Sequence, residues 1–547
     1  MNDASLKEKI EIAFSEANIS IEDLQIRRYP DETIVIVYVR KSSQSSAIAI
    51  ANELDSYLSE NGFSGFVTIK SSITKDSSCA SSNAEFSLQD SRVTDFVNLL
   101  VARSRTTETQ PSLEYIPDSK DNIATVKAAR HHLVFGRRGT GKTALLVETK
   151  SQVTAEGARA CWLNLQVYRH EEPLRVFLHA ATAICDEVQT TFDQEKRTPQ
   201  VVSLAVRLAE QCRHLLAEET PDTKRIHRLI PDLQKLIRRF GDTTSSPFYV
   251  FLDDFHYIKV EHQAYVLDML HGAVRDCNAW LKIATIQHLS KWWNPAEQVG
   301  LQSGHDAQIV NLDITLHAPT AAKGFLEKML EIYARHCGIV SLNKIYSTHP
   351  SALDRLLLAS GAVPRDYLTL SSVSVQEAKR RQNAKRVGVQ DVNKSAGDAK
   401  QRKLDELEED AAQANQLAVA NLQRIRDYCI SEKNWTYFRV EFQDKESNTS
   451  QYAMLQVLAD LRFIHLIEPS LSDEREAGQR SEVYLLDLSQ FAGQRLRRKL
   501  NLLDLVDGHL VLKRRVGVSQ DIVGSTANKR TGLLRRAPVF PLSELTT

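Results

Sequence analysis

The feature that most constrains this chain is a glycine-rich segment of eight residues, Gly136-Arg-Arg-Gly-Thr-Gly-Lys-Thr143. It fits the phosphate-binding pattern G-x-x-x-x-G-K-[ST]. The glycines let backbone N–H groups turn toward phosphate oxygens, and the helix expected next points its positive end at the same anion. Lys142 would reach the β- and γ-phosphates, and the Thr143 hydroxyl would hold Mg²⁺.

The residues on either side of this loop provide the context that the pattern requires. His132–Phe135 is a short apolar run typical of a buried strand, and Ala144–Lys150 is typical of a helix. A strand, a phosphate loop and a helix in this order indicate a nucleotide site. Two loop residues, Arg137 and Arg138, are additional cations that could strengthen phosphate binding or face a partner. The residues predicted to bind ATP are Gly136, Arg137, Arg138, Gly139, Thr140, Gly141, Lys142, Thr143 and Ala144.

A second apolar run, Phe248–Leu252, ends in two carboxylates, Asp253 and Asp254. The carboxyl end of a buried strand projects its side chains into the phosphate crevice of such a sheet. Asp253 would orient Mg²⁺, directly or through water, and Asp254 would activate the attacking water. In the alternative interpretation, both acids only cap the helix that follows.

Two further polar residues are candidates for contact with the γ-phosphate. Gln287 follows the strand Leu281–Ile286, whereas His288 beside it is equally compatible with a helix cap or a surface position. Arg365 follows a Gly-x-x-Pro turn at the start of a helix, where a cation would stabilise charge on the γ-phosphate; alternatively, it is a surface residue. The predicted catalytic residues are Asp254, Lys142, Gln287 and Arg365, and the predicted metal ligands are Thr143 and Asp253.

Strands and helices alternate between residues 93 and 315, which is typical of an α/β fold with a parallel sheet covered on both faces. We predict a P-loop ATPase core over residues 93–315 and a helical lid over residues 316–375. The expected strands of the core are Leu133–Phe135, Ala160–Leu165, Phe248–Leu252, Leu281–Ile286 and Ile309–Ile314.

The remaining segments differ from the core in composition. Residues 1–70 are expected to form a small α+β domain, for which an adaptor or oligomerisation role is the preferred interpretation. Its expected elements are helices Leu6–Ala17 and Ser46–Glu60 and strands Thr33–Val39 and Gly65–Ile69. The other predicted segments are a serine-rich flexible linker (71–92), a charged helix or linker outside any core (376–415), a winged-helix-like domain (416–490) and a basic, partly disordered tail (491–547).

Composition excludes several classes of protein. The chain has 547 residues, with 69 Lys and Arg balanced by 69 Asp and Glu, so its bulk charge favours no polyanionic partner. Seven scattered cysteines form no C-x-x-C pair, which argues against a zinc site or a disulfide framework and favours a reducing cytoplasm. The polar N-terminus has no signal core, and no apolar run is long enough to cross a membrane.

The segments GRRGTGKT, FYVFLDDFH, IATIQH and GAVPRDYL occur in an order that resembles the AAA+ ATPases of the origin-recognition and initiator type and their STAND relatives. The resemblance covers roughly residues 110–490. It implies an acidic strand, a strand-end sensor, a sensor arginine in a helical lid and a winged helix. It also implies Mg²⁺-dependent ATP hydrolysis and an arginine finger from a neighbouring subunit, for which Arg275 is a candidate.

The sequence departs from this family in its second acid and in its winged-helix candidate. The second acid is usually Glu in the initiator-type members, whereas here it is Asp254, as in many STAND proteins, so hydrolysis is expected to be slow. The winged-helix candidate, whose main helix is Ser450–Leu461, carries almost no Lys or Arg there. Protein contact or autoinhibitory packing is therefore at least as compatible with this domain as DNA contact.

The basic clusters near the C-terminus leave two interpretations open. Residues 495–499, 513–515, 529–530 and 535–536 suit nucleic acid, and equally suit a solubilising tail with a partner-binding peptide at Ala537–Leu542.

Together these features predict an ATP-driven switch that couples nucleotide state to a protein partner or to DNA, with a homo-oligomer completing the site. The alternative is a nucleotide-stabilised scaffold or adaptor with negligible turnover. A kinase is set aside because no phosphate-acceptor pocket is visible in the sequence.

Overall fold

The structure, a computed structural model, divides into two units, residues 1–85 and 86–547. In the first unit it describes residues 3–16, 19, 21–28, 33–39, 47, 50–51, 54–55 and 65–71. In the second it describes residues 86–110, 112–117, 121–194, 200–408, 412–474, 478–492, 500–516, 519–523 and 527–546.

The N-terminal unit has the predicted α+β character. Helix α1 (Asp3–Glu16) is followed by a three-stranded sheet in which β2 (Thr33–Val39) pairs antiparallel with β1 (Ile21–Arg28) and parallel with β3 (Gly65–Ser71). One face of α1 buries Leu6, Ile10 and Phe14 in the same core as alternate residues of β2. Strand β1 was not predicted because charged residues interrupt it, and the predicted helix Ser46–Glu60 lies largely outside the described residues.

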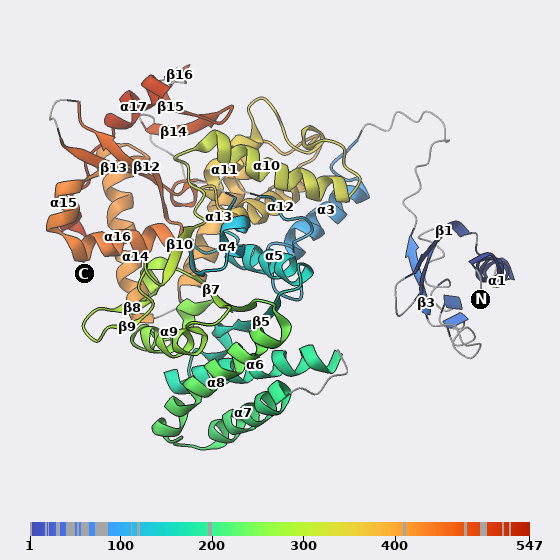
Figure 1. Ribbon diagram of the computed structural model, residues 1–547. Helices are drawn as coiled ribbons and strands as arrows, with labels where there is room; N and C mark the ends of the chain where they lie inside the picture. The colour runs from blue at the N-terminus through green and yellow to red at the C-terminus, as the bar shows by residue number, and fades with distance from the viewer. Residues whose placement is uncertain are drawn as a thin grey trace. The chain divides into compact units, whose positions relative to one another are not determined.

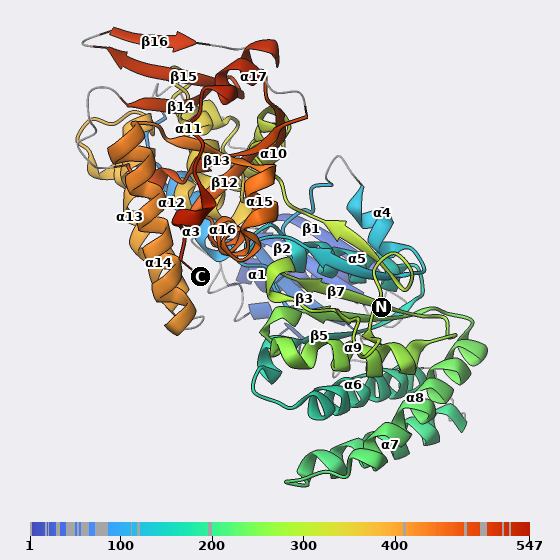
Figure 2. The same ribbon diagram turned by 90° about the vertical axis from the view of Figure 1, so that its left-hand side faces the viewer.

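The C-terminal unit is built on a five-stranded, all-parallel sheet in the order β10-β4-β7-β6-β5. Alternate residues of its strands enter different cores, because successive side chains in a strand point to opposite faces. Helices α4 and α5 cover one face, and α6 and α9 cover the other (Figure 2). The strands are β4 (His131–Phe135), β5 (Arg159–Asn164), β6 (Phe248–Asp253), β7 (Ala279–Thr285) and β10 (Ala307–Asn311), and the helices are α4 (Asn122–Lys127), α5 (Lys142–Ala155), α6 (Pro173–Gln194) and α9 (Val260–Val274).

Two helices and a short hairpin extend the core beyond the prediction. Helices α7 (Gln200–Ala217) and α8 (Thr223–Thr244) are inserted between α6 and β6 and lie on the α6 side of the sheet (Figure 1). A small hairpin, β8 (Trp293–Asn294) and β9 (Val299–Gly300), precedes β10.

A helical lid follows the sheet. It consists of α10 (Pro319–His336), α11 (Ala352–Ser360), α12 (Pro364–Arg380) and α13 (Val389–Glu408), and α3 (Ser91–Ala102) packs with them in one core. The expectation that residues 376–415 stay outside any core is wrong for α13. Its buried face carries Val392, Ala396 and Ala399, and the charged residues Asp391 and Lys403 are buried as well.

The following segment forms a compact α/β module that contains the predicted helix Ser450–Leu461. Helices α14 (Ala412–Arg426), α15 (Phe442–Ser447) and α16 (Thr449–Asp460) pack with an antiparallel sheet in the order β11-β13-β12. The strands are β11 (Tyr437–Glu441), β12 (Ile464–Ser472) and β13 (Arg480–Leu486). The lid and this module share one hydrophobic core.

The expectation of a partly disordered tail is wrong for most of residues 491–547. Strands β14 (Asn501–Val506), β15 (His509–Val516) and β16 (Ser519–Val523) form a second antiparallel sheet, and helix α17 (Ala527–Arg535) follows. Beyond it, Val539 bridges to Arg439 at the edge of β11, and Phe540 is fully buried. Basic clusters separate the buried apolar residues of this region in the sequence, which is why they were not predicted to form a core.

The described residues bear on two expectations from composition, one about membrane-spanning helices and one about cysteines. No helix among them is long and apolar enough to cross a membrane. The cysteines in the described part of the chain, Cys161, Cys185, Cys212, Cys277, Cys337 and Cys429, are all free thiols.

Replacing Phe540 tests whether the C-terminal segment is structural. Phe540 packs edge-on against Tyr428, with ring centroids 5.0 Å apart, and also contacts Phe438. Phe540→Ala is expected to lower the free energy of unfolding by about 3–5 kcal/mol in urea titrations, because it leaves a cavity in the core. The control Val506→Ala, at a partly exposed residue of β14, should change it by less than about 0.5 kcal/mol. Equal, small effects would contradict this packing.

Candidate functional site

The glycine-rich loop connects the carboxyl end of β4 to the first turn of α5. Gly139 (φ 82°) and Gly141 (φ 97°) take left-handed conformations that favour glycine. Gly139 is also crowded by the lid, since a Cβ there would lie 2.7 Å from Arg365 Cβ. The carbonyl of Gly139 accepts a hydrogen bond from the backbone N–H of Arg365 at 3.2 Å. The loop therefore packs directly against the start of α12.

Lys142 is buried within the loop that precedes it. Its Nζ donates to the carbonyl oxygens of Gly136 at 2.8 Å and Arg137 at 3.1 Å. Burial lowers the pKa of Lys142 to about 8, and the carboxylates of Asp254, Asp313 and Asp253 oppose that shift. An anion beside this ammonium group would favour its charged form.

Thr143 and Asp253 are brought together as the sequence predicted. Thr143 lies in the first turn of α5, and its Oγ1 donates to Asp253 Oδ2 at the end of β6 at 2.8 Å. Both side chains present oxygen atoms, the ligands that Mg²⁺ prefers, and Mg²⁺ usually takes only one or two carboxylates beside waters and phosphates. Among the described residues, no three His, Cys, Asp or Glu side chains gather as an all-protein metal site. The Thr143–Asp253 pair thus fits a magnesium ion carried with phosphates.

The two carboxylates at the end of β6 are held in an unfavourable environment. Burial raises the pKa of Asp253, and the neighbouring charge of Asp254 raises it further, while the hydrogen bond from Thr143 opposes the shift. Burial also raises the pKa of Asp254, against the attraction of Lys142, Arg365 and Arg138. Asp254 itself has a left-handed backbone (φ 57°), which is strained for a residue with a side chain.

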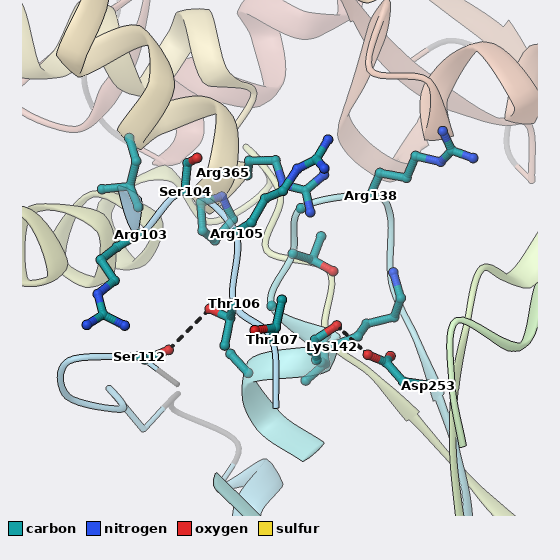
Figure 3. Close-up of a pocket in the computed structure, with 18 of the residues that line it drawn as sticks. Arg103, Ser104, Arg105, Thr106, Thr107, Ser112, Arg138, Lys142, Asp253 and Arg365 are labelled. Carbon is teal, nitrogen blue, oxygen red and sulfur yellow. Dashed lines mark hydrogen bonds between the residues drawn. The ribbon is translucent and has the colours of Figure 1, made fainter. Parts of the chain in front are cut away.

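These side chains line a cavity of about 500 Å³ between the sheet and the lid. Figure 3 shows Lys142 and Asp253 low in the cavity, with Arg138 of the loop and Arg365 of the lid extending from its upper side. His256, just beyond β6, is another lining residue, and burial lowers its pKa well below 6.5. Asp254 also lines the cavity, so acids and cations from three elements face one space.

Two of the predicted phosphate-binding residues do not line this cavity. Gly136 is covered, since a Cβ there would lie 2.5 Å from Thr140 Oγ1. Arg137 turns away into the protein, where its Nε lies 3.3 Å from Asp313 Oδ1 and its Nη2 donates to the carbonyl of Ile314 at 2.9 Å. Arg137 therefore fastens the loop to the segment after β10, whereas Arg138, Gly139, Thr140, Gly141, Lys142, Thr143 and Ala144 all line the cavity.

The strand-end candidate Gln287 is exposed and does not line the cavity. Strand β7 ends at Thr285, and the short turn η4 (Gln287–Leu289) directs Gln287 outward. His288 instead contacts Asp460 at the end of α16. Arg275, the arginine-finger candidate, is exposed between α9 and the start of β7, and therefore lies at the end of the sheet opposite the cavity.

Sequence reasoning missed a second group of lining residues. Arg103 and Arg105 follow α3 and bring two more cations to the cavity (Figure 3). An apolar wall comes from Ile116, from Phe325 and Met329 of α10, and from Leu368 of α12. Nothing in the spacing of the phosphate loop points to these positions, because the fold brings them in from outside the strand–loop–helix unit.

One family model matches a part of the chain that contains both the loop and the acidic strand. The family model of the AAA ATPase domain matches residues 122–280. A comparison with curated proteins found no match.

Similar solved structures include the Orc1 protein of Aeropyrum pernix in complex with DNA, at 15% identity over 72% of this chain and 93% of that chain, with a TM-score of 0.36. A point mutant of RuvB from Thermotoga maritima matches at 11% identity over 56% of this chain and 73% of that chain, with a TM-score of 0.28. A chain of the Drosophila ORC bound to GC-rich DNA and Cdc6 matches at 9% identity over 66% of this chain and 50% of that chain, with a TM-score of 0.32.

Asparagine at position 253 should stabilise the nucleotide-free protein. Because folding raises the pKa of Asp253, its ionisation costs stability as the pH rises above the ordinary value of 3.8. Asn cannot ionise and still offers an oxygen to Thr143. Asp253→Asn is expected to raise the free energy of unfolding by at least about 1 kcal/mol near neutral pH, with the gain vanishing below pH 3.8.

Urea titrations across this pH range measure the effect. Asp95→Asn, at an exposed residue of α3, is the control and should change stability by less than about 0.5 kcal/mol. A loss of stability in Asp253→Asn, or a gain that does not depend on pH, would contradict the raised pKa.

Proposed function

We propose that the protein is an ATP-hydrolysing switch, because residues 122–280 match the family model of the AAA ATPase domain. In this proposal, ATP binds between the sheet and the lid, and its γ-phosphate draws the lid toward the core. The module of helices α14 to α16 and strands β11 to β13 is called the C-terminal module below. It shares a core with the lid, so it then changes position and transmits the nucleotide state to a partner. A protein and duplex DNA are both candidate partners, and a neighbouring subunit is a candidate source of a further arginine.

One observation carries this proposal. The Thr143 hydroxyl, 2.8 Å from the Asp253 carboxylate, lies in the same cavity as Lys142, Asp254 and Arg365. Phosphoryl transfer to water requires a metal-binding pair, a phosphate-binding cation, a general base and a lid cation. They come from α5, β6 and α12, so their convergence depends on the whole unit.

Each side chain has a distinct role in the proposed reaction. Lys142 binds the β- and γ-phosphate oxygens, exchanging its present loop carbonyl partners for phosphate. Asp254 accepts the proton of the attacking water, which then adds to the γ-phosphorus as the bond to the β-γ bridging oxygen breaks. Arg365 and Arg138 stabilise the charge that spreads over the γ-phosphate oxygens.

Thr143 and Asp253 would hold Mg²⁺, which, when bound, neutralises phosphate charge and orients the β- and γ-oxygens. The positive end of α5 adds to the attraction for the phosphates. The apolar wall that includes Phe325 and Met329 offers a surface for the base of the nucleotide, away from the charged end of the cavity.

The second candidate function is a scaffold that binds ATP tightly and does not turn it over. The short side chain of Asp254 favours it, because an Asp carboxylate reaches less far toward the attacking water than Glu would.

Phosphate release by the wild type and by Asp254→Asn distinguishes the two functions. Asp254→Asn is expected to lower turnover by about 10²–10⁴-fold while ATP binding is retained, because it removes only the base. The matched variant Asp254→Glu restores the acid common in initiator-type relatives and should retain turnover or increase it. Each protein is measured with and without duplex DNA, and stimulation by DNA would identify it as the partner.

Two results would contradict the hydrolytic switch. One is the absence of turnover in the wild type despite ATP binding, which would support the scaffold. The other is equal turnover in the wild type and Asp254→Asn, which would place any hydrolysis at another site.

A further inference from the structure

One short turn of the C-terminal module contacts both the ATPase core and the lid. It comprises residues 460–462, from the last residue of α16 toward β12, and is called the clasp turn below. On the core side, Asp460 contacts His288, which follows β7. On the lid side, Arg462 Nη1 donates to Asp366 Oδ1 at 2.5 Å. Asp366 lies in the first turn of α12, next to Arg365. The clasp turn therefore connects the end of a core strand to the helix that carries the lid cation.

Arg462 occupies a position that normally favours glycine. Its backbone is left-handed (φ 67°), and its N–H donates to the Ala459 carbonyl at 3.0 Å. The N–H of Phe463 donates to the Leu458 carbonyl at 3.0 Å, which completes the helix-ending motif in which glycine is commonest. A long side chain in this conformation is strained. Its presence here indicates that the contacts of the guanidinium group matter.

The Arg462–Asp366 pair belongs to a buried group of charges. Lys403 of α13 donates through Nζ to the Arg462 carbonyl at 3.0 Å and lies 3.0 Å from Asp487 Oδ2. His465 Nε2 lies 2.7 Å from the same Asp487 oxygen. Burial would raise the pKa of Asp487, but Lys403 and His465 together lower it. The cations Arg462 and Lys403 thus neutralise the carboxylates Asp366 and Asp487 in a buried junction. Removing one of these side chains would leave another buried charge without its partner.

The same module reaches the phosphate loop by a second route. The ring of His465 lies over Gly361, where a Cβ would approach it to 2.1 Å. The Gly361 carbonyl faces Arg137 Nη2 at 3.5 Å, and Arg137 is in turn held by Asp313. The junction therefore borders the loop as well as the lid.

We propose that the clasp turn fixes the lid against the core, and that Arg462, acting through Asp366, is a positioning residue for Arg365. The inference rests on the proposed function, because it assigns Arg365 to the γ-phosphate. In this arrangement, a partner that pulls on the C-terminal module changes the nucleotide site directly, without touching the cavity.

The dissociation constants of ATP and ADP test the clasp. Arg462→Gly keeps the left-handed turn, relieves its strain and removes the guanidinium contacts together with the buried aliphatic part of the side chain. It is expected to weaken ATP binding about tenfold, the factor expected for one hydrogen bond between charged groups. ADP binding should change less than about twofold, since ADP lacks the phosphate that Arg365 would contact. A purely structural role would weaken both nucleotides equally. Arg462→Lys, which keeps a cation, should restore most of the preference for ATP.

Two further variants keep the test decisive. Asp460→Asn removes the negative charge that faces His288 on the core side of the clasp turn. Asp460 is partly exposed, and this variant should also reduce the preference for ATP. Arg355→Met removes another buried pair, Arg355–Asp504 (3.3 Å), between α11 and β14. It should lower stability and leave the ATP-to-ADP ratio unchanged.

The outcomes separate this inference from the function on which it rests. A wild type that binds ATP no better than ADP would overturn the role of Arg365 and the clasp with it. A wild type that prefers ATP, with the preference intact in Arg462→Gly and Asp460→Asn, would overturn the clasp alone. A loss of preference in Arg355→Met as large as in Arg462→Gly would also overturn it, because any buried pair would then have the same effect.

Discussion

The parallel pairing of five buried strands is the constraint on which the C-terminal unit depends. Parallel strands all end at the same edge, so the loop after β4 and the acids at the end of β6 lie at that edge together. Burial on both faces favours apolar residues along the strands, and the carboxylates of the site come at the end of β6 and directly after it. The chemistry of the site is therefore concentrated at one edge, and the lid needs to cover only that edge.

The site itself is assembled against an electrostatic cost. Asp253 and Asp254 are adjacent carboxylates with raised pKa values, and Lys142 is a buried ammonium whose pKa is lowered. Loop carbonyls accept hydrogen bonds from Lys142, and Thr143 donates to Asp253. Groups whose burial costs free energy in this way are the ones that a charged ligand can stabilise, which is typical of functional sites.

The lid and the C-terminal module behave as one packed body in this structure. They share a hydrophobic core, and buried charges such as Lys403 and Arg462 connect α13, the clasp turn and the start of α12. The C-terminal segment adds to this body, since Phe540 fills its core and Val539 extends the edge of β11. A movement of the lid therefore has to move the module or break the junction, which is the physical basis of the proposed switch.

The sequence alone determined the parts of this protein that depend on local pattern. The glycine loop, the acidic pair after an apolar strand, and the Gly-x-x-Pro turn before Arg365 each carry their geometry within a few residues, and the structure brings all three to one cavity. The five parallel strands followed from apolar runs alternating with helices. These features could be predicted because glycine conformations, apolar strand patterns and helix starts depend on residues that are close together in the chain.

The tertiary structure decided the directions of individual side chains. Arg137 and Arg138 are adjacent and chemically identical, yet Asp313, distant in the sequence, holds one away from the cavity that the other lines. Gln287 faces solvent because β7 ends at Thr285 and Gln287 begins the short turn η4, while Arg103 enters from a segment before the sheet. Such outcomes depend on which distant partner lies within a few ångströms, and only the folded chain contains that information.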